Sequence, residues 1–195
     1  MKKYCLFLSL IILSTIVSAQ QDSKKSMAVA ADPVVWCGID FTSAKFVNVQ
    51  ETAEQVKGVL NPINTLIITE SKKYDVPKFF KKKQVFFELS LVQERNGKIE
   101  PDHLISYNPN HLSYEDLQKV TTAYKGVSDK AETGLIFIVE NCDKASMSAS
   151  VYVCFFDIKT GDIIYYTRKE GKPKGFGLRN FWAYSFYSIM KSWKY

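Results

Sequence analysis

Residues 34–41 read VVWCGIDF, a continuous run of β-branched, aromatic and other apolar residues. A run of this length without alternating polar positions is typical of a β-strand that is buried on both faces. Such a strand needs helices packed on the sheet that contains it. We therefore expect an α/β domain built around residues 34–41.

The rest of the chain supplies four more strand patterns and three helical regions. Strands are predicted at 84–92 (QVFFELSLV), 135–140 (LIFIVE), 148–157 (SASVYVCFFD) and 162–168 (DIIYYTR). Helical spacing of apolar residues predicts helices over 51–74, 114–125 and 178–193. We expect Pro62 to break or kink the first of these helices, and Ser113 to cap the second.

These elements follow one another in the order β-α-β-α-β-β-β-α. Right-handed crossovers place the first three strands parallel in the order 2-1-3. A tight turn at Lys159-Thr160-Gly161 joins the last two strands as a hairpin beside the third. The predicted fold is a single layered α/β domain whose mixed five-stranded sheet has the order 2-1-3-4-5 and helices packed on it.

The first residues of the chain have the three parts of a secretory signal peptide. Lys2 and Lys3 precede an apolar run at 4–17, and small residues follow at Ser18 and Ala19. The apolar run is shorter than the roughly 20 residues that span a bilayer, which favours cleavage after Ala19 over an uncleaved anchor helix. The sequence therefore predicts a signal peptide at 1–19 and an exported protein, periplasmic or extracellular, with no transmembrane segment in the mature chain.

The mature chain is predicted to begin with a flexible leader at 20–32, which is polar and small, and to continue as one α/β domain at 33–195. A content of 46% apolar and 14% aromatic residues excludes a disordered chain. Cys37, Cys142 and Cys154 are odd in number and lie in or beside apolar strands, so we expect buried free thiols, although export permits a disulfide. No Cys/His spacing indicates a metal, and no motif indicates a cofactor.

A glycine-rich segment at 171–177 (GKPKGFG) precedes the last predicted helix. Glycines let backbone N–H groups approach a ligand, and a helix N-terminus with nearby cations attracts anions. The segment is a candidate site for a phosphate, a sulfate or a sugar carboxylate, with the residues Lys172, Lys174, Gly175, Gly177 and Arg179. It lacks the GK[ST] ending of a P-loop. The alternative is a plain connection with solvated lysines.

Three further groups of residues carry weaker signals. Asp40 ends the first predicted strand, where it either faces a ligand crevice or caps the following turn. His103 and His111 lie in a loop and could form a general base with Asp102 or Glu115, or a nucleophile pair with a cysteine. The alternative for both histidines is simple exposure to solvent.

The densest basic patch is the segment 78–83 (KFFKKK), in which two phenylalanines lie among the lysines. Export favours anionic lipid headgroups or lipopolysaccharide over nucleic acid as the partner of such a patch. The candidate surface-binding residues are Lys78, Lys81, Lys82 and Lys83. The alternative is a solvated junction whose two phenylalanines pack beneath the second strand.

The predicted layout and the signal peptide together resemble periplasmic domains of bacterial envelope assembly proteins, such as that of the curli secretion channel and the amino-terminal domain of the Tol-Pal translocation protein. The stretches 38–46 (GIDFTSAKF) and 155–182 (FFDIKTGDIIYYTRKEGKPKGFGLRNFW) are similar to uncharacterised secreted proteins of Bacteroidetes. These resemblances imply an exported α/β protein and assign a role to no residue.

The sequence thus favours a non-enzymatic envelope or secreted module that binds a partner protein or an anionic surface. The first alternative is a hydrolase that acts on an extracellular polymer and uses His103, His111 or Asp40. The second alternative is a protein that binds a small anion at the glycine-rich segment.

Overall fold

The structure is a computed structural model that describes residues 23–194 of the 195-residue chain. The predicted signal peptide and its cleavage point after Ala19 lie outside these residues. Within the described range, no helix has the length and apolarity that a membrane crossing demands.

The described residues form one mixed sheet of seven strands. The strands are β1 (Val34–Asp40), β2 (Lys45–Val47), β3 (Val85–Phe87), β4 (Ile105–Ser106), β5 (Thr133–Asp143), β6 (Ser148–Asp157) and β7 (Ile163–Gly171). β1 lies parallel between β3 and β5, while β6 and β7 continue antiparallel beyond β5. The predicted order 2-1-3-4-5 is therefore confirmed for the five main strands. The predicted count is too low, because β2 and β4 extend the parallel part alongside the end of β5.

Besides the helical segment 23–30, the described residues contain five helices and a short 3-10 turn at Pro101–His103. The helices are α2 (Ala53–Thr69), α3 (Val76–Phe79), α4 (Ser90–Gly97), α5 (Tyr114–Thr122) and α6 (Leu178–Lys191). Ser113 caps α5 through a reciprocal pair of hydrogen bonds with Asp116, as its position in the sequence predicts. Residues 23–30 are also helical, so this part of the predicted flexible leader has regular structure.

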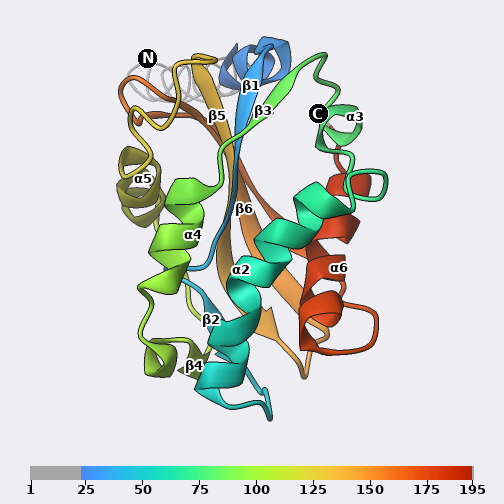
Figure 1. Cartoon of the computed structure of the whole chain (residues 1–195). Helices are drawn as coiled ribbons and strands as arrows, with labels where there is room; N and C mark the ends of the chain where they lie inside the picture. Colours follow the sequence, from blue (N-terminus) through green and yellow to red (C-terminus); the bar gives the residue numbers. More distant parts are fainter. Residues whose placement is uncertain (1–22, 195) are drawn as a thin grey trace, which may run out of the picture.

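Helices cover both faces of the sheet. α2 and α6 lie together over one face (Figure 1). On that face, Phe155 of β6 packs against Phe80 and Trp193. Its neighbour Phe156 points to the other face and packs against Tyr124, just after α5, with ring centroids 6.2 Å apart. The sheet is therefore the central layer of the domain.

The segment 84–92 is predicted as one strand, and this prediction is wrong. Only Val85–Phe87 pairs with β1, and α4 begins at Ser90. Beyond Trp36 the free edge of β1 is occupied by two buried asparagine side chains instead of a strand. Asn64 of α2 bonds both backbone groups of Ile39, at 2.7 and 2.9 Å, so the edge remains hydrogen-bonded without β3.

Asn96 of α4 completes this substitute for a strand. Its side chain accepts a hydrogen bond from the N–H of Phe41 at 2.9 Å and donates one to the carbonyl of Ile39 at 3.0 Å. α4 can approach because Gly38 has no side chain: a Cβ there would lie 2.8 Å from Val92 and 2.9 Å from Leu89. The φ of Gly38 is also +92°, which side chains rarely adopt.

The predicted break at Pro62 is also wrong, because α2 runs continuously from Ala53 to Thr69. Pro62 lies on the exposed side of the helix, where a carbonyl that loses its partner can tilt toward water. The carbonyl that faces the proline ring belongs to Gly58, whose surroundings are open. Val56, Leu60, Ile63 and Ile67 of α2 lie in the core.

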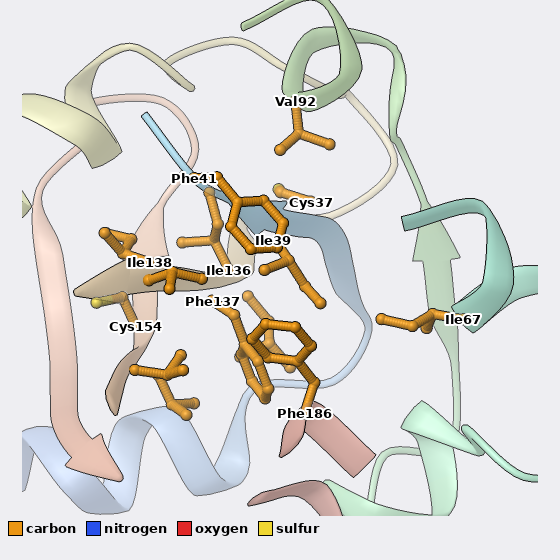
Figure 2. Packing of buried hydrophobic residues seen from close by; sticks show 14 of the residues in the cluster. Cys37, Ile39, Phe41, Ile67, Val92, Ile136, Phe137, Ile138, Cys154 and Phe186 are labelled. Carbon is orange, nitrogen blue, oxygen red and sulfur yellow. The ribbon is translucent and has the colours of Figure 1, made fainter. Parts of the chain in front are cut away.

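The core is rich in aromatic side chains from both layers. Figure 2 shows Phe41, Phe137 of β5, Ile67 of α2 and Phe186 of α6 among these buried side chains, and the rings of Phe41 and Phe186 meet edge to face with centroids 5.7 Å apart. Cys37, Cys142 and Cys154 are buried in this core, and all three are free thiols. Burial raises the pKa of each thiol well above its usual value. The prediction of buried free cysteines is confirmed for these three.

Candidate functional site

Asp40 is the fully buried carboxylate at the end of β1. Its Oδ1 accepts hydrogen bonds from the backbone N–H of Thr42, at 2.8 Å, and from the hydroxyl of Thr42. Its Oδ2 accepts from Nε of Arg95 at 2.9 Å and from the hydroxyl of Tyr124 at 2.7 Å. Asp40 therefore caps the following turn and joins β1 to α4 and to the end of α5.

The guanidinium of Arg95 is held in place by this cluster. Besides its bond to Asp40, it donates from Nη2 to Oγ1 of Thr42 at 3.2 Å, and it lies 5.3 Å from the ring centroid of Tyr124. Burial lowers the pKa of Arg95, but the charge of Asp40, the hydrogen bond to Asp40 and the interactions with Tyr124 together outweigh burial, so that the pKa is raised. Burial and Asp40 both raise the pKa of the Tyr124 hydroxyl. Both groups keep their protons, and Arg95 stays charged.

Above this cluster lies the β1 cleft, an open cavity of about 530 Å³ between the β1–β2 turn, α4, the 3-10 turn and α5. Its lining residues are Thr42, Ser43, Ala44, Lys45, Arg95, Ile99, His103, Leu104, Asn110, Leu112, Asp116, Lys119 and Val120. The cleft follows the carboxyl end of a parallel strand, where ligands bind in open α/β sheets. Asp40 itself does not line it, but two residues bonded to Asp40 do.

One wall of the β1 cleft is fixed to the sheet by side chains of β5. Asn141 forms two hydrogen bonds with the backbone of Asn110, at 2.6 and 2.8 Å, and Glu140 accepts one from the N–H of Leu112 at 3.1 Å. Glu140 also pairs with Arg168 at 2.8 Å. The loop before α5 is therefore held against the sheet by bonds at Asn110 and Leu112.

The structure places the two histidines that were candidates for a general base in different surroundings. His103 lines the β1 cleft, whereas His111 is exposed and does not line it. Over residues 23–194, neither imidazole forms a hydrogen bond or an ion pair with a carboxylate. Cys37 and Cys142, the cysteines that could serve as nucleophile partners of a histidine, are both buried. The histidines thus occupy the positions expected of exposed loop residues.

The glycine-rich loop (Gly171–Gly177) joins β7 to α6 and projects from the domain (Figure 1). Gly175 and Gly177 have φ angles of +117° and +79°, so the sharp path of the loop depends on them. Phe176 between them is 95% exposed. The cations of the loop and of the first turn of α6, Lys172, Lys174 and Arg179, are also exposed.

A hollow of about 230 Å³ lies beside Phe176, between the loop and Phe181. It is also lined by Glu51 and Lys144, which pair with each other at 2.6 Å. Because this pair neutralises itself, the positive charge of the region comes from the glycine-rich loop and not from the hollow.

The predicted basic patch at 78–83 is only partly a surface. Lys78, Lys81 and Lys83 are exposed, but Lys82 is 5% exposed. Its Nζ donates to the backbone carbonyls of Ala28 and Val29, each at 2.8 Å, at the end of the helical segment 23–30. Phe80 packs in the aromatic core against Trp36 and Phe137. Lys82 is thus a buried anchor for the N-terminal helical segment and not a surface residue.

Burial lowers the pKa of Lys82 from 10.5 to about 8, against the opposing charge of Asp32. Between these two values the unfolded chain binds more protons at Lys82 than the folded chain, so the folded state gains stability as the pH rises. We expect the free energy of unfolding of the wild-type protein to increase from pH about 8 to about 10 relative to that of Lys82→Met. Urea denaturation at several pH values measures this difference. Parallel profiles for the two proteins would contradict it.

Comparisons with known proteins find no family and only weak structural similarity. No protein-family model matches the chain, and no curated protein matches it. Four solved chains match in structure, and two of them are the C-terminal domain of LpoB from Salmonella enterica and the hypothetical protein CT253 from Chlamydia trachomatis. The LpoB domain is 14% identical with a TM-score of 0.35, and the match covers 78% of this chain and 95% of that one. CT253 is 12% identical with a TM-score of 0.31, and the match covers 74% of each chain.

Proposed function

We propose that this protein is an exported, non-catalytic module that docks on an anionic membrane surface through the glycine-rich loop (Gly171–Gly177). The observation that carries the proposal is the 95% exposure of Phe176, with exposed cations on both sides of it in the sequence. An apolar ring surrounded by cations is the chemistry that binds the interface of an anionic bilayer.

The loop that presents Phe176 is held at its base. The N–H of Lys174 donates to the carbonyl of Phe181 at 3.3 Å, and Asn180 donates from its side chain to the carbonyl of Phe176 at 3.3 Å. Pro173 is buried. Because the loop is already ordered, little conformational entropy remains to be lost when it meets a surface.

The other basic surface lies apart from the glycine-rich loop. Lys78 and Lys81 lie at α3, beside the C-terminal half of α6, where Phe79 packs on Tyr187 at 5.9 Å. The glycine-rich loop lies at the opposite end of α6 (Figure 1). The lysines of α3 therefore serve as a control that carries equal charge at a distance from the loop.

The bonding of Asp40 favours binding over catalysis. Each of its two carboxylate oxygens accepts two hydrogen bonds, and Arg95 forms an ion pair with it. A carboxylate in this state is a structural group that has no free oxygen for a general base. The proposed hydrolase would need a base elsewhere, and the two histidines lack a carboxylate partner to orient them.

The test is co-sedimentation of the purified mature protein with phosphatidylcholine vesicles, with and without phosphatidylglycerol. Binding is expected only with the anionic lipid. Since each lysine near such a surface contributes about 1 kcal/mol, the double change Lys172→Glu and Lys174→Glu should weaken binding by at least about 30-fold. Phe176→Ser should also weaken it, because the ring no longer enters the interface.

Two matched controls sharpen this result. The double change Lys78→Glu and Lys81→Glu alters the net charge equally, and Tyr107→Ser removes a side chain that is 97% exposed. Both control proteins should bind as the wild type does. Equal losses of binding in the control and loop variants would mean that net charge alone drives binding. Absence of binding to either vesicle would contradict membrane docking and leave a partner protein as the target.

A further inference from the structure

We propose that the β1 cleft binds a small amphipathic anion, in which a carboxylate or phosphate head is joined to an apolar body. This site is separate from the glycine-rich loop, and the proposal does not depend on membrane docking. It rests on three features of the cleft: an apolar floor, cations from three separate segments, and carboxylates whose oxygens are already engaged.

The floor of the cleft is apolar. Ala44, Leu104, Ile99 and Val120 line it and are each less than 9% exposed. Leu112 adds a half-buried side chain to the wall. These side chains come from the β1–β2 turn, the region around the 3-10 turn, and α5. A hydrocarbon group that enters the cleft would exchange water for apolar neighbours, which favours binding in proportion to the area covered.

Three cations surround this floor: Lys45, Arg95 and Lys119. Lys45 donates from Nζ to the backbone carbonyl of His103, a neutral acceptor that leaves its charge uncompensated. The side chain of Arg95 is 24% exposed and fixed by Asp40 and Thr42. A fixed guanidinium can bind an oxyanion without first losing side-chain freedom.

The carboxylates near the cleft are engaged by the protein itself. Asp40 lies below it with both oxygens bonded, as described above. Asp116 accepts from the backbone and hydroxyl of Ser113 at 3.1 and 2.8 Å, and its other oxygen lies 3.6 Å from Lys119. Three cations against these two carboxylates leave a charge of +1 (3 − 2) for a ligand to neutralise.

The test is NMR titration of the full mature chain with hexanoate and with hexyl phosphate, which share an apolar body and differ in the head. Saturable shifts are expected at the backbone amides of Ser43, Lys45 and Lys119. Hexanoate should bind at least about tenfold more tightly than acetate, because each buried methylene contributes up to about fourfold. Hexanol, which lacks the anionic head, should bind more weakly than hexanoate.

Variants then separate this site from the rest of the surface. The double change Lys45→Gln and Lys119→Gln should weaken binding of the tighter ligand about fivefold or more, since one exposed ion pair contributes up to about fivefold. Lys119→Gln alone is a milder variant, because this side chain is 79% exposed and its loss leaves the fold intact. Lys159→Gln in the β6–β7 turn, and the loop variant Lys172→Glu with Lys174→Glu, should bind as the wild type does.

Three outcomes would overturn the proposal. One is the absence of saturable shifts at the cleft amides with either hexanoate or hexyl phosphate. The second is equal affinity for hexanoate and acetate, which would remove the role of the floor. The third is unchanged affinity in the Lys45 and Lys119 double variant, which would remove the role of the cations. Failure of vesicle binding alone would leave the cleft proposal standing.

Discussion

Replacement of Gly171 with alanine is expected to destabilise the protein by about 3 kcal/mol, near the upper end of what overpacking costs. A Cβ at this position would lie 2.1 Å from the carbonyl oxygen of Ser185 and 2.9 Å from Cγ1 of Ile189. Both belong to the buried side of α6, so the helix would have to move away from β7. Urea denaturation measures the loss as a lower transition midpoint at an unchanged slope.

Gly58→Ala is the matched control, because it makes the same chemical change where space is open. A Cβ at Gly58 meets nothing within 4 Å, and the residue lies inside α2. Alanine favours a helix interior by about 0.5–1 kcal/mol over glycine, so this variant should be more stable than the wild type. Similar stability for Gly171→Ala and Gly58→Ala would show that β7 and α6 do not pack as closely as described.

The second large effect is expected at Asp40. Asp40→Ala removes the acceptor of four hydrogen bonds and leaves the partly buried charge of Arg95 without its partner. Loss of one member of a buried pair costs about 3–5 kcal/mol, and we expect a destabilisation in this range. Chemical denaturation of the variant checks this value.

Glu94→Ala supplies the comparison, since it breaks an ion pair with Lys98 whose side chains are 57% and 74% exposed. An exposed pair of this kind contributes at most about 1 kcal/mol. Asp40→Ala should therefore cost several times more than Glu94→Ala. Equal costs would mean that water enters the Asp40 cluster and solvates Arg95.

The order of the main strands could be predicted because it follows from chain connectivity. Buried runs such as 34–41 and 135–140 mark parallel strands, and handedness then fixes their neighbours. β2 and β4 were not predicted, because strands of three and two residues are too short to show a periodic pattern of apolar residues. The segment 84–92 was misjudged because nothing local shows that Asn64 and Asn96 take over the edge of β1.

The candidate sites were predictable in part. Gly175 and Gly177 adopt the positive φ angles expected of the glycine-rich segment, and Asp40 caps the turn after β1. Lys82 could not be distinguished from its neighbours, because its burial depends on a helical segment more than fifty residues earlier. The β1 cleft was missed since its cations come from three distant segments. The sequence feature closest to the cleft was Asp40, the carboxylate at the end of the buried strand β1.

If the chain is exported as proposed, its three buried thiols bear on the order of folding and thiol oxidation. A chain that emerges unfolded into an oxidising compartment exposes Cys37, Cys142 and Cys154 to oxidants and to one another. In the native protein each sulfur is enclosed and protonated, and therefore inert. Under the proposed export, folding that encloses these thiols before oxidants reach them, and not a crosslink, would keep the cysteines from mispairing.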